Sequence, residues 1–228
     1  MAEYTSRSFD LLTLGQLLLR LSPPDNDRLS RGDTFVKQVG GAELNVAVGA
    51  SLLGLRTGVI SKLPSHDIGS FMKGKIRSFG VSDDFFMYDD SPSARVGIYY
   101  YENGAYPRKP KVIYDRMNSS FFSLNIDEIP KEVYTASKCF HTTGITLALS
   151  PQIRETTIEM IKRFKEAGTL VSFDVNFRGN LWSGDEAREC ILKILPYVDI
   201  FFCSEDTARL TFLKTGTAKE MMKSFTEE

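Results

Sequence analysis

Apolar positions along the chain alternate between short β-rich runs and longer stretches with helical spacing. The short runs predict strands at Phe9–Leu14, Thr57–Leu63, Cys139–Thr142, Leu170–Asp174 and Ile200–Cys203. The longer stretches predict helices at Ala42–Leu53, Ile68–Phe79, Pro151–Ala167, Gly184–Leu195, Glu205–Leu213 and Ala218–Phe225. Strands that alternate with helices indicate βαβ units, so we expect an α/β fold with a mainly parallel sheet and helices on both faces.

One region departs from this alternation. Val96–Tyr101 and Lys111–Tyr114 are both strand-like, and the turn-rich segment Glu102-Asn103-Gly104-Ala105 separates them without a helix. We therefore expect a small antiparallel sheet that stands off the main body. The run Leu17–Leu21 is a candidate to join it.

Composition narrows the class of protein. The chain has 228 residues, of which 42% are hydrophobic and 25% charged, and a formal net charge of −1, as expected of a soluble globular protein without a basic surface for nucleic acid. Its three cysteines are widely spaced and it has two histidines, so neither a disulfide framework nor a zinc site is expected. No run of about 18 apolar residues predicts a membrane span. These features favour a cytoplasmic protein without a membrane or nucleic-acid partner.

The first candidate site is a pair of glycines, Gly40 and Gly41, directly before a predicted helix that carries Asn45 in its first turn. Here the backbone can approach a ligand closely and present unpaired N–H groups. The alternative is a tight turn before an ordinary helix start. The P-loop and dinucleotide-binding glycine signatures are both missing from the sequence.

The second candidate site combines Tyr99 with Tyr114 and Arg116 at the ends of the two extra strands. A guanidinium offers a fork of donors to a carboxylate, and phenols bond to hydroxyls, so these residues can hold a polyhydroxy acid. The alternative is a solvated edge strand, which is how we interpret the neighbouring cations Arg108, Lys109 and Lys111.

The third candidate site follows the strand Leu170–Asp174, where Asn176 and Arg178 lie in a polar loop. Open α/β sheets place ligands at the carboxyl ends of their strands, so these two residues can meet phosphate or substrate, and Asp174 can organise the loop or a hydrated metal. The alternative is a capped strand end with a surface arginine. His141, on a predicted buried strand, is interpreted as a structural histidine.

These motifs together resemble the ribokinase-like (PfkB) sugar kinases. The resemblance rests on Gly40 to Asn45, on Leu53-Gly54 and Ile68-Gly69, and on the segment from Gly15 to Pro24, and it extends over essentially the whole chain. Among these kinases the chain is most similar to the 2-keto-3-deoxygluconate kinases. Those enzymes usually have glutamate where Gln16 stands, which weakens any role assigned to that position.

The resemblance implies roles for the candidate residues. Gly40, Gly41 and Asn45 would line the sugar site, while Tyr99, Tyr114 and Arg116 would hold the acid end from a β lid. Asn176 and Arg178 match residues that contact substrate and ATP phosphates. Ser204, before Glu205, stands where the family often has an asparagine that faces the nucleotide. The implied cofactors are ATP and magnesium, with no metal ligand assigned in this chain.

The resemblance also implies a domain organisation and an activity. Residues 1–228 would form the N-terminal two-thirds of a PfkB-type kinase domain, with lid segments near 15–39 and 95–116, and the C-terminal part of the fold would be missing. The family's Gly-Ala-Gly-Asp motif, which carries the catalytic aspartate, does not occur in the 228 residues. We therefore expect no catalytic residue here and an inactive fragment of an ATP-dependent 2-keto-3-deoxygluconate kinase.

Other interpretations of the sequence stay open. The intact protein could be a PfkB kinase for fructose, 5-dehydro-2-deoxygluconate or a nucleoside, or a non-catalytic sugar-acid-binding remnant. The small-molecule sugar acid is the expected partner. The resemblance also suggests a homodimer formed through the β lid.

Overall fold

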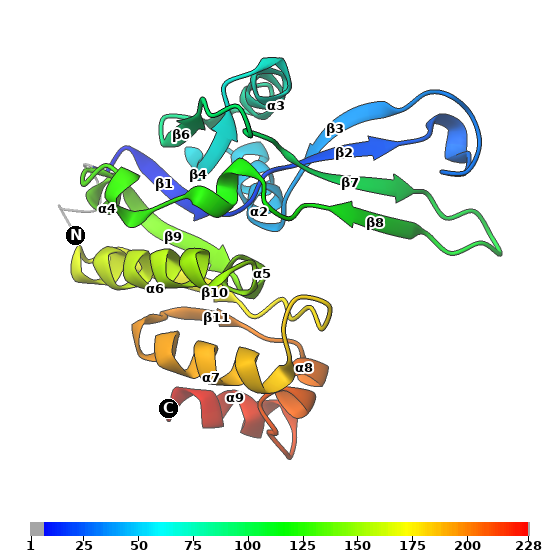
Figure 1. The fold of residues 1–228 in the computed structure, drawn as a ribbon. Coiled ribbons are helices and arrows are strands. Elements are labelled where there is room, and N and C mark those ends of the chain that lie inside the picture. Colours follow the sequence, from blue (N-terminus) through cyan, green and yellow to red (C-terminus); the bar gives the residue numbers. More distant parts are fainter. Residues whose placement is uncertain (1–6, 228) are drawn as a thin grey trace. The chain divides into compact units, whose positions relative to one another are not determined.

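A computed structural model describes residues 7–227. These residues form two compact units (Figure 1). The first unit comprises residues 7–14 and 125–227, and the second comprises residues 15–124.

The first unit contains a parallel sheet with the strand order β11-β10-β9-β1. Its strands are β1 (Phe9–Leu14), β9 (Ser137–Thr143), β10 (Leu170–Asp174) and β11 (Ile200–Phe202). The bounds of β1 and β10 are those predicted from the sequence. β9 is longer than predicted, since the polar Ser137 and Lys138 continue the pairing with β1.

Helices pack against this sheet. They are α4 (Val133–Ala136), α5 (Gly144–Ala148), α6 (Pro151–Glu166), α7 (Gly184–Ile194), α8 (Glu205–Leu210) and α9 (Ala218–Thr226), with short 3-10 turns η3 (Ile126–Glu128) and η4 (Leu195–Tyr197). Phe164 of α6 stacks on Phe140 of β9 with ring centroids 4.1 Å apart, which anchors the longest helix to the sheet. The predicted helix Glu205–Leu213 was too long: α8 ends at Leu210, and Leu213 has a positive φ of 57° that no helix accommodates.

The second unit has a body of two helices and three short parallel-paired strands. Its elements are α2 (Ala42–Leu52), β4 (Thr57–Pro64), α3 (Asp67–Arg77), β5 (Val81–Ser82) and β6 (Phe86–Asp89), together with the 3-10 turns η1 (Pro24–Asn26) and η2 (Ser120–Ser123). The helices α2 and α3 each end shortly before a glycine, Gly54 and Gly80. Both glycines have a positive φ, 90° and 75°, just beyond the ends of α2 and α3.

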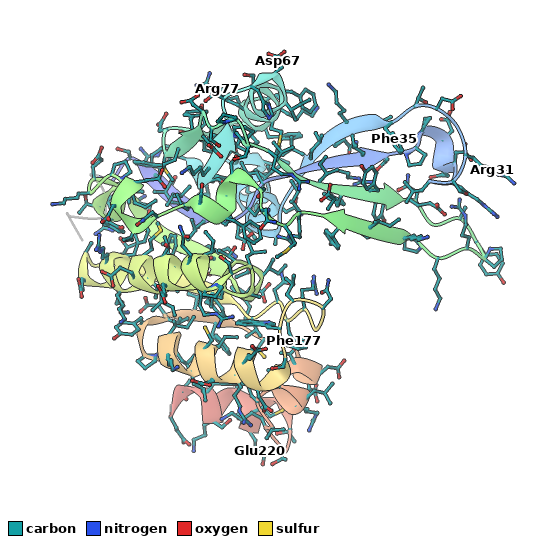
Figure 2. All side chains as sticks on the ribbon, in the orientation of Figure 1. Arg31, Phe35, Asp67, Arg77, Phe177 and Glu220 are labelled. Atoms are coloured by element: carbon teal, nitrogen blue, oxygen red, sulfur yellow. The ribbon has the colours of Figure 1, made fainter. Side chains whose placement is uncertain are left out.

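The same unit carries a four-stranded sheet, which we call the lid sheet, formed by β2 (Leu18–Ser22), β3 (Val36–Gly40), β7 (Gly97–Glu102) and β8 (Lys111–Asp115). The order is β3-β2-β7-β8; the outer pairs are antiparallel, and the central pair, β2 with β7, is parallel. The sheet extends away from α2 and α3, and Arg31 and Phe35 lie at its far end (Figures 1 and 2). The expected fold class, a mainly parallel sheet flanked by helices with a small additional sheet, is confirmed.

One face of the lid sheet packs on the core of its own unit. Leu19 of β2 belongs to a buried cluster with Leu44 of α2 and Met72 of α3, and Val39 and Ile98 pack against the same cluster. Because side chains alternate along a strand, Arg20 and Tyr99 point to the opposite face, on which Gly40 also lies. The sequence alternation therefore leaves polar and aromatic side chains on the face of the lid sheet that does not pack on the core.

Candidate functional site

The residues predicted from the sequence fall into two groups, one in each unit. Gly40, Gly41, Asn45, Tyr99, Tyr114 and Arg116 belong to the second unit, whereas Asn176, Arg178 and Ser204 belong to the first.

The outward face of the lid sheet brings two members of the first group, Tyr99 and Tyr114, together. Arg20 pairs with Tyr99 across β2 and β7, and Tyr99 pairs with Tyr114 across β7 and β8, so the three side chains form one row. The rings of Tyr99 and Tyr114 have centroids 5.9 Å apart. Burial raises the pKa of Tyr99, and the charge of the Arg20 guanidinium partly opposes this. The Tyr99 phenol therefore stays protonated at neutral pH and can donate a hydrogen bond.

Gly40 provides space beneath this row. A Cβ atom at Gly40 would lie 2.4 Å from the hydroxyl oxygen of Tyr99 and 2.9 Å from its Cε1 atom. Gly97 of β7 lies on the other side of Leu18 from Gly40. It is also crowded, because a Cβ there would lie 2.6 Å from Leu18 Cδ2. A side chain at position 40 would therefore displace the Tyr99 side chain.

Gly41 is the N-cap residue of α2, and no side chain caps this helix start. A Cβ at this position would approach the carbonyl oxygen of Gln16 to 2.9 Å, so the turn requires glycine. Asn45, one turn into α2, is exposed, and its backbone N–H donates to the Gly41 carbonyl at 3.0 Å. The glycine pair and Asn45 therefore form one helix start with an exposed amide side chain.

Arg116 is buried with 9% exposure immediately after β8. Its guanidinium carbon lies 5.6 Å from the ring centre of Tyr114. Burial lowers the pKa of Arg116, while the negative charge of Glu43 raises it. Arginine remains charged even when its pKa is lowered by burial, so a cation lies beside Tyr114 at one end of the row.

Sequence reasoning missed the residues that hold this arginine. Gln16 is 3% exposed and accepts a hydrogen bond from Arg116 Nε at 2.8 Å. Glu43, 2% exposed in the first turn of α2, supplies the nearby negative charge. The signal was the placement of two hydrophilic residues, Gln16 and Glu43, inside otherwise apolar or glycine-rich segments, since buried polar side chains need partners.

The second group lies at the carboxyl end of β10. Asn176 has a positive φ of 37°, and its backbone N–H donates to Asp174 Oδ1 at 3.1 Å, which fixes a tight turn. Burial raises the pKa of Asp174; the Asn176 N–H and the charge of Arg178 oppose this rise. Arg178 is exposed on the same loop as Phe177 (Figure 2). Asn176 and Arg178 therefore lie on one loop at the carboxyl end of β10.

Ser204 has a structural partner. Its hydroxyl accepts from the Thr207 backbone N–H at 3.2 Å and lies 2.8 Å from Thr207 Oγ1, which caps α8. Because the hydroxyl is engaged in this cap, it is less available for a hydrogen bond to a ligand than the side chains of Asn176 and Arg178 are.

A cavity of about 790 Å³ lies in the first unit beside β11, lined mainly by apolar side chains such as Phe201, Met221 and Phe225. Glu205 also lines it, but none of the nine predicted site residues does. Within residues 7–227, no three His, Cys, Asp or Glu side chains gather into a metal-binding group. The same residues contain no helix that is long and apolar enough to cross a membrane.

Comparison with known proteins places this geometry in a family. The chain is 38% identical over 209 residues to a 2-dehydro-3-deoxygalactonokinase of Haloferax volcanii, an alignment that covers 92% of this chain and 65% of the relative. It is 32% identical over 225 residues to a probable fructokinase-3 of Arabidopsis thaliana, which covers 97% of this chain and 64% of that relative. The chain thus spans somewhat less than two-thirds of the length of these relatives.

A solved structure has the same fold. The 2-dehydro-3-deoxygluconokinase of Thermotoga maritima superposes with a TM-score of 0.87 at 32% identity, over 96% of this chain and 68% of that one. The model of the pfkB family of carbohydrate kinases matches residues 8–227. The chain therefore belongs to the pfkB family of carbohydrate kinases.

Proposed function

We propose that the protein is an ATP-dependent kinase that transfers phosphate to the terminal hydroxyl of 2-keto-3-deoxygluconate, a sugar acid also called 2-dehydro-3-deoxygluconate. Gly40, Gly41 and Asn45 hold the sugar chain, and Tyr99, Tyr114 and Arg116 hold its carboxylate end. The activities of the Haloferax and Thermotoga relatives, both kinases of 2-dehydro-3-deoxy sugar acids by name, support this substrate class.

The observation that carries the proposal is the buried guanidinium of Arg116 at the base of the aromatic row. Burying a cation is costly unless an anion or hydrogen-bond acceptors compensate it. Gln16 and the charge of Glu43 already compensate part of this cost, and a substrate carboxylate would add to it by forming bidentate hydrogen bonds with the guanidinium. A neutral sugar has no anionic group that could pair with this guanidinium.

Asn176 and Arg178 are assigned to the phosphates, where the amide and the guanidinium donate hydrogen bonds to phosphate oxygens. Ser204 remains a weaker cofactor-binding assignment because its hydroxyl caps α8. Magnesium is accommodated without a protein cage, because this ion keeps several waters and is bound through one or two carboxylates and the phosphates. When bound, it neutralises charge on the transferring phosphoryl group.

The domain and its activity are part of the proposal. Residues 1–228 correspond to the N-terminal two-thirds of a pfkB-type kinase domain, with lid segments near 15–39 and 95–116. The 65% coverage of the Haloferax relative supports this proportion. Since phosphoryl transfer needs a base for the attacking hydroxyl, and the family's aspartate motif is not among the 228 residues, the chain alone binds the sugar acid weakly and does not turn it over.

Two alternatives have specific support. The 38% identity to a 2-dehydro-3-deoxygalactonokinase favours the galactonate counterpart, which presents the same carboxylate to Arg116. The 32% identity to a probable fructokinase favours a neutral ketose, which would leave the charge of Arg116 unused. A kinase for 5-dehydro-2-deoxygluconate or a nucleoside, and a non-catalytic sugar-acid-binding remnant, are the remaining alternatives.

Assembly and location are further parts of the proposal. The open face and outer strands of the lid sheet expose apolar side chains such as Val36, Val112 and Tyr114, which supports pairing of two copies through the lid. The free cysteines Cys139, Cys190 and Cys203 support a reducing, cytoplasmic location.

The test compares binding of 2-keto-3-deoxygluconate and D-fructose to the 228-residue chain by ligand-observed NMR. Arg116→Ala should weaken binding of the acid about 100-fold, because a desolvated charge pair is lost, and change fructose binding less than about threefold. Lys111→Ala removes an exposed cation from β8, the strand that precedes Arg116, and should change the binding of neither sugar.

Equal weakening of acid and fructose by Arg116→Ala would contradict a carboxylate-binding role. Preferential binding of fructose by the unmodified chain would favour the fructokinase alternative. Adding ATP and magnesium to the chain should give no phosphorylation, and turnover well above background would contradict the proposed inactivity.

A further inference from the structure

The turn that follows β10 is fixed at its first step by two neighbouring segments. Val175, which is 1% exposed, donates its backbone N–H to the Phe202 carbonyl oxygen of β11 at 2.9 Å. Its own carbonyl oxygen lies against Gly144 at the start of α5, where a Cβ atom would approach it to 2.1 Å. The backbone on both sides of Val175 is therefore held in place by buried contacts.

Asn176 determines where the chain goes next. Its φ of 37° lies in the left-handed region, which residues other than glycine rarely adopt, although asparagine tolerates it better than most. A left-handed residue turns the backbone sharply, whereas an extended residue would continue in the direction of β10. The path of the backbone to Arg178 thus depends on the conformation of this one residue.

Asp174 holds Asn176 in that conformation. Asp174 is the last residue of β10, and it is paired with Thr143 of β9 on one side and with Phe202 of β11 on the other. Its Oδ1 accepts a hydrogen bond from the Asn176 backbone N–H at 3.1 Å, which closes an Asx turn. The geometry supports the first of the two roles that the sequence leaves open for Asp174, organising the loop.

The charge of Asp174 shows that the turn needs a reason. Asn176 and Arg178 are assigned to phosphates, and a carboxylate beside a phosphate site repels the ligand. A gain must therefore outweigh this repulsion. A turn that is fixed before the ligand arrives supplies such a gain, because it lowers the entropy that the loop loses on binding. Residues in sparsely populated backbone conformations persist where their surroundings hold them, and they cluster at ligand sites.

We propose that Asp174 is a positioning residue, which holds Asn176 in its left-handed conformation and so directs the side chains of Asn176 and Arg178 to the phosphates. The inference deepens the proposed function and rests on its assignment of these two residues to phosphate. Asp174 itself makes no contact with the ligand and acts through the loop.

The experiment compares Asp174→Ala with Asp174→Asn, which removes the charge but keeps an oxygen acceptor for the turn. Tripolyphosphate without magnesium is the probe, and its dissociation constant is measured from the shifts of the Asn176 and Arg178 amide resonances in the ¹⁵N-labelled 228-residue chain. Loss of the negative charge alone would make both variants bind this polyanion more tightly. The positioning role predicts instead that Asp174→Ala weakens binding at least about threefold, while Asp174→Asn binds at least as tightly as the unmodified chain.

Asp185→Ala is the matched control, because Asp185 is an aspartate in α7 of the same unit whose side chain is 89% exposed. It should leave tripolyphosphate binding within about twofold of the unmodified chain. Tighter binding by Asp174→Ala, or an equal loss in Asp174→Ala and Asp174→Asn, would overturn the inference.

A second readout tests the turn itself and covers the case in which Asp174→Ala does not fold. Burial raises the pKa of Asp174, although the Asn176 N–H and the charge of Arg178 oppose this. The Asn176 amide resonance of the unmodified chain should therefore move between pH 7 and pH 4, as the carboxylate that accepts its hydrogen bond becomes protonated. Cys203, near Asp174, stays a thiol in this range because its pKa is raised to about 11. Asp174→Asn should remove the movement, and a resonance that still moves as in the unmodified chain would overturn the positioning role.

The two readouts separate this inference from the proposed function. If tripolyphosphate moves neither the Asn176 nor the Arg178 resonance in the unmodified chain, the assignment of this loop to phosphate fails, and the inference falls with it. If the unmodified chain binds tripolyphosphate and Asp174→Ala binds it equally well, the inference alone is refuted.

Discussion

Gly40 shows how a single residue decides the shape of the site. Its φ is not in the left-handed region, so its role is space and not backbone freedom. A Cβ would lie within 3 Å of the Tyr99 hydroxyl oxygen and of its Cε1 atom, and Tyr99 also packs against Tyr114, so the ring would have to move. The glycine is therefore needed for the position of the phenol.

This leads to a matched pair of glycine substitutions. Gly40→Ala should weaken sugar-acid binding about tenfold, because Tyr99 is displaced, and should destabilise the fold only modestly. Gly49→Ala in α2 meets no atom within 4 Å, so it should leave binding unchanged and stabilise the helix by roughly 0.5–1 kcal/mol. Binding titration and thermal unfolding check both; similar binding losses in the two variants would contradict this role of Gly40.

At the scale of single residues, the sequence indicated which side chains carry hydrogen-bond donors and charges. It did not indicate which residues they contact. Tyr99, Tyr114 and Arg116 could be selected because phenols and a guanidinium stood at strand ends, and the structure brings them together. The contacts of Gln16 with Arg116 and with Ser119 join residues about 100 positions apart. No local pattern records such a contact, so these positions became visible only in the fold.

At the scale of elements, the long periodic segments were predicted well and the weak ones were not. α6 begins at Pro151 as expected, because proline is favoured in the first turn and Ser150 caps the helix. β3 was not predicted, since Val36, Lys37 and Gln38 are all exposed and give no apolar alternation. The parallel pairing of β2 with β7 was also missed, because strand direction depends on the whole path of the chain.

The pairing of β9 with β10 leads to a prediction about pH. His141 of β9 is 4% exposed and lies opposite Ser172 of β10, with its Nδ1 2.9 Å from the serine hydroxyl. No described residue is a hydrogen-bond partner of its Nε2. Burial lowers the pKa of His141 to about 4. These features agree with the structural interpretation of His141 and leave it neutral in the folded protein.

Because the folded-state pKa of His141 lies below its ordinary value of about 6.5, the unfolded chain binds the extra proton first on acidification. The contribution of His141 to stability is therefore complete above pH 6.5 and declines as pH falls toward 4, by about 3 kcal/mol in all. In urea unfolding across this range, His141→Asn should lose less stability on acidification than the unmodified chain. His66→Asn, at the exposed start of α3, is the control. The same dependence of the unfolding free energy on pH in all three proteins would refute the prediction.

At the scale of the whole molecule, the sequence pattern was sufficient for the fold class and the family. Alternating strands and helices predicted the mainly parallel sheet, and the glycine and lid motifs pointed to the pfkB family, whose model matches residues 8–227. The 790 Å³ cavity beside β11 could not be predicted, because it arises from the packing of α8 and α9. That cavity and the lid face are thus two distinct places where a small molecule could bind.

The central claim is that the lid sheet holds the carboxylate of a sugar acid on Arg116. The most direct measurement is a crystal structure of the chain with 2-keto-3-deoxygluconate. The account predicts the carboxylate within hydrogen-bond distance of the Arg116 guanidinium, with the sugar chain beside Tyr99, Tyr114 and Gly40. A sugar acid bound in the cavity beside β11, or one on the lid sheet with its carboxylate turned away from Arg116, would contradict it.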